Sequence, residues 1–342
     1  MKMPLRAGII GCGGISRVHI ASLMEMENAQ IVAVCDICAD RMADAALKTG
    51  AEAVPDWKAL ISRNDVDIVH ILTPHYLHAP MAIAALKAGK HVLTEKPMAT
   101  TLEDAQKMIT EADRSKGTLN VIFQNRYNPS TVELKRRIDN GETGKLICAR
   151  APVCWHRTAE YYSESGWRGQ FSTEGGGTLI NQAIHTLDLL SYLGGPVARV
   201  RGHVSTDLLK GTIEVEDNCH AVFEYENGAT GVLHATNNYG VDAPILLEMT
   251  FKNGTYQLLA EKLFKIEDGI PQLILRGDDA KNLGNKSYWG ASHKTQISRV
   301  YDCIQNGVPF EIDGRSAFPA LCLVKSIYES SKKDDWVALK KV

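Results

Sequence analysis

The sequence has little of what marks membrane, secreted or nucleic-acid-binding proteins. Its 342 residues contain no apolar run near the ~18 residues that a membrane-spanning helix needs. The N-terminal stretch MKMPLRAGIIGCGG leads into glycines rather than into the small-residue cleavage site of a signal peptide. No block of like charge occurs, and 38 Lys and Arg nearly balance 40 Asp and Glu. These absences predict a cytoplasmic protein that binds neither membranes nor nucleic acid.

Metal and disulfide chemistry also have little support. The eight cysteines are scattered, and only Cys35 and Cys38 form a CxxC pair. No second Cys or His pair stands at the spacing of zinc ligands, so we expect no metal. The pattern favours packing residues with reduced thiols, while a redox or metal role of the CxxC pair remains the alternative.

What is present is an alternation of strands and helices in the first third of the chain. Apolar runs typical of buried strands occur at residues 5–11, 30–36, 66–74, 90–97 and 118–125, with helical patterns between them. This order predicts a parallel sheet with helices on both faces. A chain of this length is expected to form two domains.

A glycine-rich turn, GCGGIS, follows the first predicted strand directly. Gly11 and Gly13 match the first two glycines of the dinucleotide-binding fingerprint, and Ser16 stands at the third position. Such a turn lets backbone N–H groups approach a pyrophosphate. Asp36 ends the second strand 20 residues beyond Ser16, where a carboxylate binds the adenosine ribose and repels a 2′-phosphate. Residues 1–124 are therefore predicted to form a Rossmann domain that binds NAD in preference to NADP.

Residues 125–342 have a different pattern, rich in strands. Asn227-Gly228 and Asn253-Gly254 are strong hairpin signals between apolar runs. We predict an α+β domain with a large, mostly antiparallel open sheet, on which a helix from about Thr178 to Leu193 packs. Later helices are expected near residues 293–305 and 315–330, the last of them able to pack back on the first domain. Because an open sheet needs both faces covered, we expect a homodimer or homotetramer.

Two segments carry candidate chemistry. The last predicted strand of the first domain ends in TEKP, and a lysine at that end of a parallel strand points into the crevice where such sheets bind ligands. This argument singles out Lys96. The stretch GGGTLINQAIHTLD places Asn181, His185 and Asp188 at spacings of four and three, on one face of a helix. Such a row is not typical of ordinary scaffold.

Together, GIIGCGGISRVHI, Asp36, TPHYLHAPMAIAALKAGKHVLTEKP and GGGTLINQAIHTLD resemble the glucose–fructose oxidoreductase/inositol dehydrogenase/rhizopine catabolism (Gfo/Idh/MocA) family of NAD(P)-dependent oxidoreductases. The resemblance covers essentially the whole chain, with the motifs in the expected order. It implies an NAD-dependent sugar or cyclitol dehydrogenase that acts on a CH–OH group, with the nicotinamide between the domains. The segment YYSESGWRG also resembles members that act on pyranosides, including nucleotide-sugar 3-dehydrogenases, which implies oxidation at C3.

The resemblance assigns catalytic roles to Lys96, near the nicotinamide and the substrate hydroxyl, and to His185, the acid/base residue. Asn181 stands where the family typically has Asp; it accepts no proton but can orient a sugar hydroxyl. Asp188 either orients His185 or supports the helix. The other expected substrate-binding residues are Arg168, Tyr162, His156 and Tyr127. The expected cofactor-binding residues are Gly11, Gly13, Gly14, Ile15, Asp36, Thr73, Pro74, His78, Glu95, Lys96 and Arg126.

Two other functions remain open beside the net dehydrogenase. One is a glycosidase of this family that oxidises C3 transiently, eliminates the aglycone and regenerates NAD. The other is a non-catalytic NAD(H)-sensing protein that keeps the Rossmann fold as a regulator. The presence of both Lys96 and His185 favours catalysis over sensing.

Overall fold

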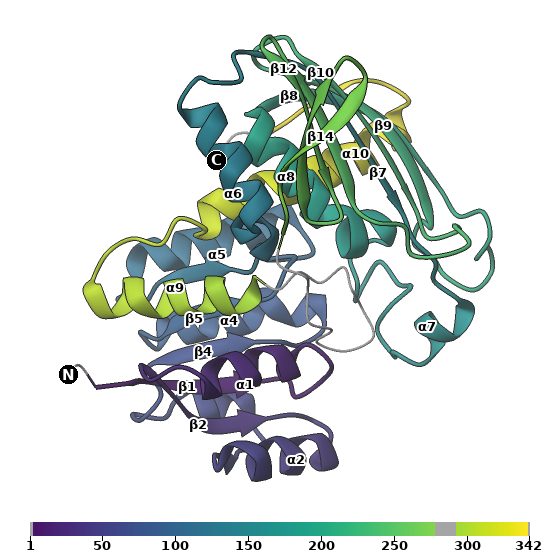
Figure 1. Ribbon diagram of the computed structural model, residues 1–342. Coiled ribbons are helices and arrows are strands. Elements are labelled where there is room, and N and C mark those ends of the chain that lie inside the picture. Colours follow the sequence, from purple (N-terminus) through teal and green to yellow (C-terminus); the bar gives the residue numbers. More distant parts are fainter. Residues whose placement is uncertain (1–2, 278–291, 341–342) are drawn as a thin grey trace. The chain divides into compact units, whose positions relative to one another are not determined.

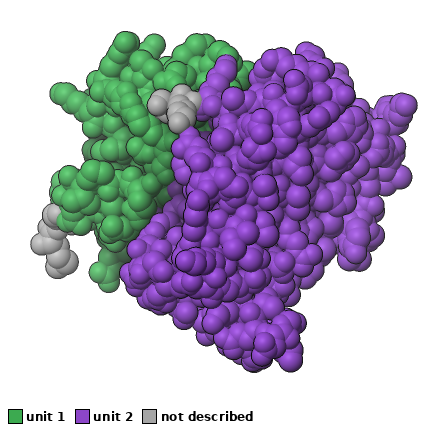
Figure 2. Space-filling model, turned by 90° about the horizontal axis from the view of Figure 1, so that it is seen from above, with its two compact units in different colours: residues 1–124, 292–318 green, residues 125–291, 319–342 purple. Residues whose placement is uncertain are grey.

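The computed structural model describes residues 3–277 and 292–340. Residue contacts divide the chain into two units, which Figure 2 shows in different colours. Unit 1 comprises residues 1–124 and 292–318, and unit 2 comprises residues 125–291 and 319–342. Residues 292–318, which the sequence pattern places in the second domain, thus group with the first.

Unit 1 is built on a six-stranded parallel sheet, which confirms the predicted Rossmann fold. Its strands are β1 (Leu5–Ile10), β2 (Ala29–Cys35), β3 (Glu52–Ala53), β4 (Ile68–Ile71), β5 (His91–Thr94) and β6 (Leu119–Val121), in the order β3-β2-β1-β4-β5-β6. The order reverses between β1 and β4, and such sheets bind ligands beyond the carboxyl ends of the strands at the reversal. We call the segments that follow β1, β2, β4 and β5 the cofactor edge.

Helices lie on both faces of this sheet (Figure 1). They are α1 (Ser16–Met24), α2 (Ala39–Thr49), α3 (Trp57–Ile61), α4 (His78–Lys87), α5 (Leu102–Arg114) and α9 (His293–Asn306). Helix α4 packs against α5, and α9 packs against α1. Side-chain bonds of Gln296 fix α9 to the end of β6: Oε1 accepts from Phe123 N at 3.0 Å, and Nε2 donates to Val121 O at 2.7 Å. These bonds explain why residues 292–318 belong to unit 1.

Unit 2 contains a nine-stranded sheet in the order β14-β13-β12-β11-β7-β10-β9-β8-β15. The strands are β7 (Leu146–Cys154), β8 (Val197–Ser205), β9 (Asn218–Tyr225), β10 (Thr230–Thr236), β11 (Leu246–Phe251), β12 (Gly254–Leu259), β13 (Lys262–Glu267), β14 (Ile270–Leu275) and β15 (Val337–Ala338). Only β7 and β10 pair in parallel, which confirms the mostly antiparallel sheet. Both expected hairpins form, and in the second Phe251 pairs with Gly254, so that Lys252 and Asn253 make the turn.

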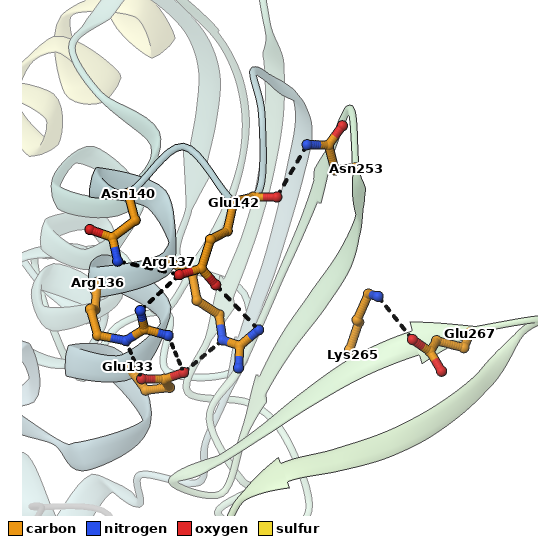
Figure 3. Close-up of polar contacts among 8 residues, drawn as sticks. All are labelled: Glu133, Arg136, Arg137, Asn140, Glu142, Asn253, Lys265 and Glu267. Atoms are coloured by element: carbon orange, nitrogen blue, oxygen red, sulfur yellow. Dashed lines mark hydrogen bonds and ion pairs between the residues drawn. The ribbon is translucent and has the colours of Figure 1, made fainter.

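The helices of unit 2 are α6 (Pro129–Asp139), α7 (Ala159–Ser163), α8 (Ile184–Gly194) and the greater part of α10 (Gly314–Lys333). Helix α8 packs on β7 and β11, and Gly202 of β8 leaves room for Ile327 of α10. A surface network holds α6 to the loop that follows it: Glu133 accepts from Arg136 and Arg137, and Glu142 accepts from Arg136 and Asn140 (Figure 3). Within the described ranges, no helix has both the length and the hydropathy needed to cross a membrane.

The other face of the nine-stranded sheet carries exposed apolar side chains. Val222 of β9 and Val232 of β10 lie opposite each other and are 41% and 46% exposed, and Ile147 of β7 is 54% exposed. The homo-oligomer that the open sheet suggested remains a prediction, and this face is the surface on which to test it.

Candidate functional site

The glycine turn after β1 contains two kinds of glycine. Gly11 has a φ of +97°, and a Cβ there would lie 2.6 Å from the carbonyl oxygen of Leu72, so only glycine fits. Around Gly13 and Gly14, by contrast, no described residue other than their chain neighbours comes within 4 Å of where a Cβ would stand. Their backbone borders open space at the N-terminus of α1, where the pyrophosphate of a dinucleotide fits.

Ser16 occupies the third fingerprint position without opening the turn. It is buried as the first residue of α1, and its Oγ donates a 2.6 Å hydrogen bond to the Gly13 carbonyl. Ile15 precedes it at the N-cap, so the expected cofactor residues Gly13, Gly14 and Ile15 lie together at the positive end of α1.

Asp36 connects the glycine turn to the end of β2. Its Oδ2 accepts from Cys12 N and its Oδ1 from Cys38 N, each at 2.7 Å. Because a carboxylate oxygen can accept more than one hydrogen bond, both oxygens can still bind ribose hydroxyls. The adjacent thiols do not suggest redox chemistry, since burial and the nearby Asp36 charge raise the pKa of Cys35 to about 11.

The segment after β4 brings Thr73 and Pro74 to the cofactor edge, where both are half-buried. His78 of α4 is fully buried: its Nδ1 lies 2.7 Å from the Pro97 carbonyl oxygen and its Nε2 lies 2.8 Å from that of Thr73. Burial lowers the pKa of His78, although both carbonyls favour the charged ring. His78 therefore ties the Thr73 segment to the segment that carries Lys96, a supporting role that requires no contact with the cofactor.

Lys96 is the only residue from Val92 to Ala99 that is not buried. The neighbouring Glu95 is buried, and its Oε1 lies 3.1 Å from His19 Nε2 and 3.6 Å from His293 Nε2. Burial alone would raise the pKa of Glu95, but the two imidazoles outweigh it and hold the pKa well below its usual range. Glu95 thus anchors the loop that presents Lys96 at the cofactor edge.

A hydrogen-bond chain continues from Glu95 into the core of unit 1. His19 Nδ1 lies 2.9 Å from His70 Nδ1, and His70 Nε2 lies 2.9 Å from the Tyr301 hydroxyl. Burial lowers the pKa of both histidines, so each ring carries one proton. Because the carboxylate of Glu95 can only accept, His19 must donate from Nε2, His70 from Nδ1, and Tyr301 from its hydroxyl. One charged end therefore determines every tautomer in the chain.

In unit 2, the glycine run at the start of the candidate helix is required by close packing. A Cβ on Gly176 would lie 2.0 Å from the Tyr328 hydroxyl, and one on Gly177 would lie 1.9 Å from the Glu216 carbonyl oxygen. The buried carboxylate of Glu216 accepts from Gly177 N and Leu179 N, each at 2.9 Å, and from the Tyr328 hydroxyl at 2.8 Å. The run therefore lets the helix begin directly on a buried acceptor.

The helix itself starts with a π-helical turn over Leu179–Ala183, which the sequence did not reveal, and continues as α8. π-Turns are frequent at functional sites. From Leu179 to Leu190 every residue is buried except Asn181 and His185. We call these two residues the helix face.

Asp188 and Arg126 form a buried ion pair instead of serving the helix face. Arg126 Nε and Nη2 donate to the two carboxylate oxygens at 2.8 and 2.5 Å, and the guanidinium lies 4.7 Å from the centre of the Tyr192 ring. This bidentate pair is already the geometry that both groups prefer. It favours a structural role for Asp188 and for Arg126, whose expected contact with the cofactor remains a prediction.

The aromatic residues after β7 are interleaved with arginines. Tyr161 lies between Arg157 and Arg168, whose guanidinium carbons are 5.3 and 4.4 Å from its ring centre. Arg157 is buried and paired with Asp242 at 2.8 Å. Arg168 also lines an open groove of about 510 Å³ together with Tyr162 and the segments 163–170 and 211–214.

The other expected substrate residues have varied surroundings. Tyr162 is buried, and its hydroxyl accepts from Asn237 Nδ2 at 2.8 Å, which supports the loop. His156 is exposed, with Nδ1 2.8 Å from the Tyr239 carbonyl oxygen, and Tyr127 is half-buried. Sequence reasoning missed Glu174, Arg157 and Asn237. Only Glu174 carried a signal, its place directly before the glycine run.

Comparison with known proteins agrees with the folds of both units. Residues 5–123 match the model of an oxidoreductase family with an NAD-binding Rossmann fold, and residues 131–257 match the Gfo/Idh/MocA C-terminal domain. Levoglucosan dehydrogenase of Pseudarthrobacter phenanthrenivorans is 27% identical over 97% of this chain and 97% of its own length. Inositol 2-dehydrogenase 3 of Saccharopolyspora erythraea is 33% identical over 75% of this chain and 73% of its own.

Among solved structures, the WlbA dehydrogenase from Bordetella pertussis, in complex with NADH and UDP-GlcNAcA, is similar with a TM-score of 0.87 and 28% identity, covering 99% of this chain and 100% of its own. The glycine turn, the parallel sheet and the open second sheet fit these findings. The chain belongs to the Gfo/Idh/MocA family of NAD-binding oxidoreductases, whose named relatives include sugar and inositol dehydrogenases.

Proposed function

We propose that this enzyme uses NAD to oxidise a secondary alcohol on a cyclic sugar, cyclitol or glycoside, with C3 of a pyranoside as the favoured position. The observation that carries the proposal is selective exposure. Lys96 is the one half-buried residue from Val92 to Ala99, and Asn181 and His185 are the half-buried residues from Leu179 to Leu190, where all the others are buried. An ammonium, an amide and an imidazole presented from buried backbone match the needs of alcohol oxidation. The family resemblance supports the same residues.

NAD, when bound, takes up the hydride from the carbinol carbon. We assign His185 to accept the proton of the reacting hydroxyl and Lys96 to stabilise the negative charge that develops on its oxygen. Asn181 orients the sugar, because an amide both donates and accepts hydrogen bonds. Trp167 and Arg168 carry flat groups of the kind that stack on pyranose rings.

We infer a preference for NAD over NADP from Asp36 and its neighbour. Asp36 is half-buried at the end of β2, and Ile37 after it is fully exposed and carries no positive charge. A 2′-phosphate at this position would meet the Asp36 carboxylate, and Ile37 supplies no charge to offset it, whereas two ribose hydroxyls would meet acceptors.

The test is NADH formation, followed by absorbance, with NAD and a panel of free sugars, inositols, alkyl and aryl glucosides, levoglucosan and UDP-sugars. We expect one class to give NADH, and Lys96→Met and His185→Ala each to lower kcat/KM at least 100-fold. Lys107→Met, which removes an exposed lysine from α5, is the control and should leave the rate unchanged. Wild-type turnover in Lys96→Met would refute the assignment of that residue.

A flat absorbance trace separates the alternatives. Aglycone release without net NADH would identify the glycosidase that oxidises C3 transiently. Tight NADH binding without turnover on any substrate would identify the sensing protein. Both outcomes would replace the net dehydrogenase.

A further inference from the structure

Glu174 is a buried carboxylate for which the proposed reaction has no role. Its Oε2 accepts a hydrogen bond from Gly169 N and its Oε1 accepts one from Asn181 Nδ2, both at 2.6 Å. Burial and the nearby Glu216 carboxylate disfavour the charged form, while the two donors and nearby Arg168 favour it. Burial outweighs the others and raises the pKa of Glu174 to about 7, so this group changes charge near neutral pH.

The two donors to Glu174 differ in what they can do when it binds a proton. Gly169 N is a backbone group and can only donate. The amide of Asn181 can rotate by half a turn, which exchanges its donor and its acceptor. A protonated Glu174 has an O–H that needs an acceptor, and the Oδ1 of a rotated Asn181 supplies it. Protonation of Glu174 therefore favours the rotated amide.

We propose that Glu174 is a positioning residue that sets which group Asn181 presents to the substrate. With Glu174 ionised, Nδ2 is held by the carboxylate and Oδ1 is directed to a sugar hydroxyl; with Glu174 protonated, Nδ2 takes that place. The substrate part of this inference rests on the proposed function, whereas the switch itself lies wholly within unit 2. Asn181 accepts a hydrogen bond from the sugar hydroxyl when Glu174 is ionised and donates one to it when Glu174 is protonated. The two states therefore bind a given sugar with different affinity.

The pair also accounts for the departure from the aspartate that the family typically has at this position. Aspartate at residue 181 would bring two carboxylates to about the separation now seen between Glu174 Oε1 and Asn181 Nδ2, 2.6 Å. Two carboxylates at hydrogen-bond distance cannot both ionise, so one would bind a proton at neutral pH. With asparagine at 181, the partner of Glu174 Oε1 is not titratable, and the nearest carboxylate that acts on the pKa of Glu174 is that of Glu216, which raises it.

The switch can be tested without substrate. The side-chain amide of Asn181 is observed by NMR in protein labelled with 15N-asparagine, and the signal is identified by its loss in Asn181→Ala. We expect its shift to follow a single titration with a midpoint near pH 7, to lose that titration in Glu174→Gln, and to keep it with a moved midpoint in Glu174→Asp. Glu248→Gln, which removes a carboxylate bound to Arg150 and Gln257 on the sheet, is the matched control and should leave the titration intact.

A flat Asn181 signal between pH 5 and 9, or a titration that persists in Glu174→Gln, would overturn the switch. If the switch is observed, the kinetic arm uses whichever sugar the substrate panel identifies. A positioning role predicts that the KM of the wild-type enzyme changes several-fold across pH 6–8 and that of Glu174→Gln does not, with a smaller change in kcat. An equal pH dependence of KM in both enzymes would refute the effect on substrate. Failure of the whole panel would count against the proposed function and leave the NMR result standing.

Discussion

Gly11 and Gly13 lie two residues apart in one turn, yet an alanine should have opposite effects at the two positions. At Gly11 the new Cβ would meet the Leu72 carbonyl oxygen at 2.6 Å on a backbone with φ of +97°. The left-handed backbone alone costs about 1–2 kcal/mol for a residue with a Cβ, and the overlap with backbone atoms adds to it. We expect Gly11→Ala to lose about 3 kcal/mol of unfolding free energy, or roughly 6–12 °C in Tm for a domain of this size.

Gly13→Ala should leave stability unchanged, because beyond the chain neighbours no residue in the described part of the chain comes within 4 Å of the added methyl group. The methyl group would instead occupy the space that the pyrophosphate needs, and we expect the Kd for NADH to rise at least about 10-fold, equivalent to 1.4 kcal/mol. Thermal unfolding of the ligand-free proteins measures the first effect, and calorimetric titration with NADH measures the second. A Gly13→Ala protein that binds NADH as tightly as wild type would refute the placement of the pyrophosphate. Wild-type Tm in Gly11→Ala would refute the packing argument.

Four further changes test other parts of the structure. Asp36→Asn should shift the ratio of NADPH to NADH affinity at least about 10-fold toward NADPH, because it removes the charge that repels a 2′-phosphate; an unchanged ratio would contradict this. Glu95→Gln should lower the unfolding free energy at pH 7 by about 2–4 kcal/mol in urea denaturation. Because the pKa of Glu95 is lower in the folded state than its usual 4.5, the difference in unfolding free energy between wild type and Glu95→Gln should narrow as the pH falls below 4.5. A difference that stays constant with pH would count against an ionised Glu95. Glu174 should show the opposite dependence of stability on pH, because its pKa is raised in the native state, which keeps its proton up to about pH 7. Wild type should therefore lose unfolding free energy relative to Glu174→Gln as the pH rises from 4.5 to 7, and the Tm values of the two proteins at pH 5 and pH 8 would show this. Val232→Glu should convert the expected dimer or tetramer into a monomer of 37.6 kDa, as measured by light scattering. An unchanged oligomer would show that the exposed sheet face is not the interface.

Much of the fold was predictable because local patterns determine it. Short buried strands alternating with helices admit little besides a parallel sheet, and the glycine turn identified its ligand edge. Residues 292–318 could not be assigned to unit 1, since the contacts that hold them there are the packing of α9 on α1 and the hydrogen bonds that join Gln296 to Val121 and Phe123, all between residues far apart in the sequence. No periodicity reports such a contact.

Lys96 and His185 are recognisable as candidate site residues from their position in a motif, and their catalytic roles stay predictions. The partners of Asp188 and Asn181 are not recognisable in this way, because Arg126 and Glu174 reach them only through the folded chain. The π-turn at Leu179–Ala183 was missed for a related reason: its register depends on how tightly the glycine run packs on Glu216 and Tyr328.

The chain of single protons from Tyr301 to Glu95 has a consequence for how this enzyme can vary. Each imidazole donates one hydrogen bond toward Glu95 and accepts one from the side of Tyr301. A replacement that can only donate or only accept therefore sets two donors or two acceptors against each other. Single substitutions at His19 or His70 should therefore be rejected in a mutational library. Joint replacement of His19, His70 and Tyr301 by apolar residues of matched volume removes the conflict together with the chain. In descent, these positions should be inherited and lost as a set.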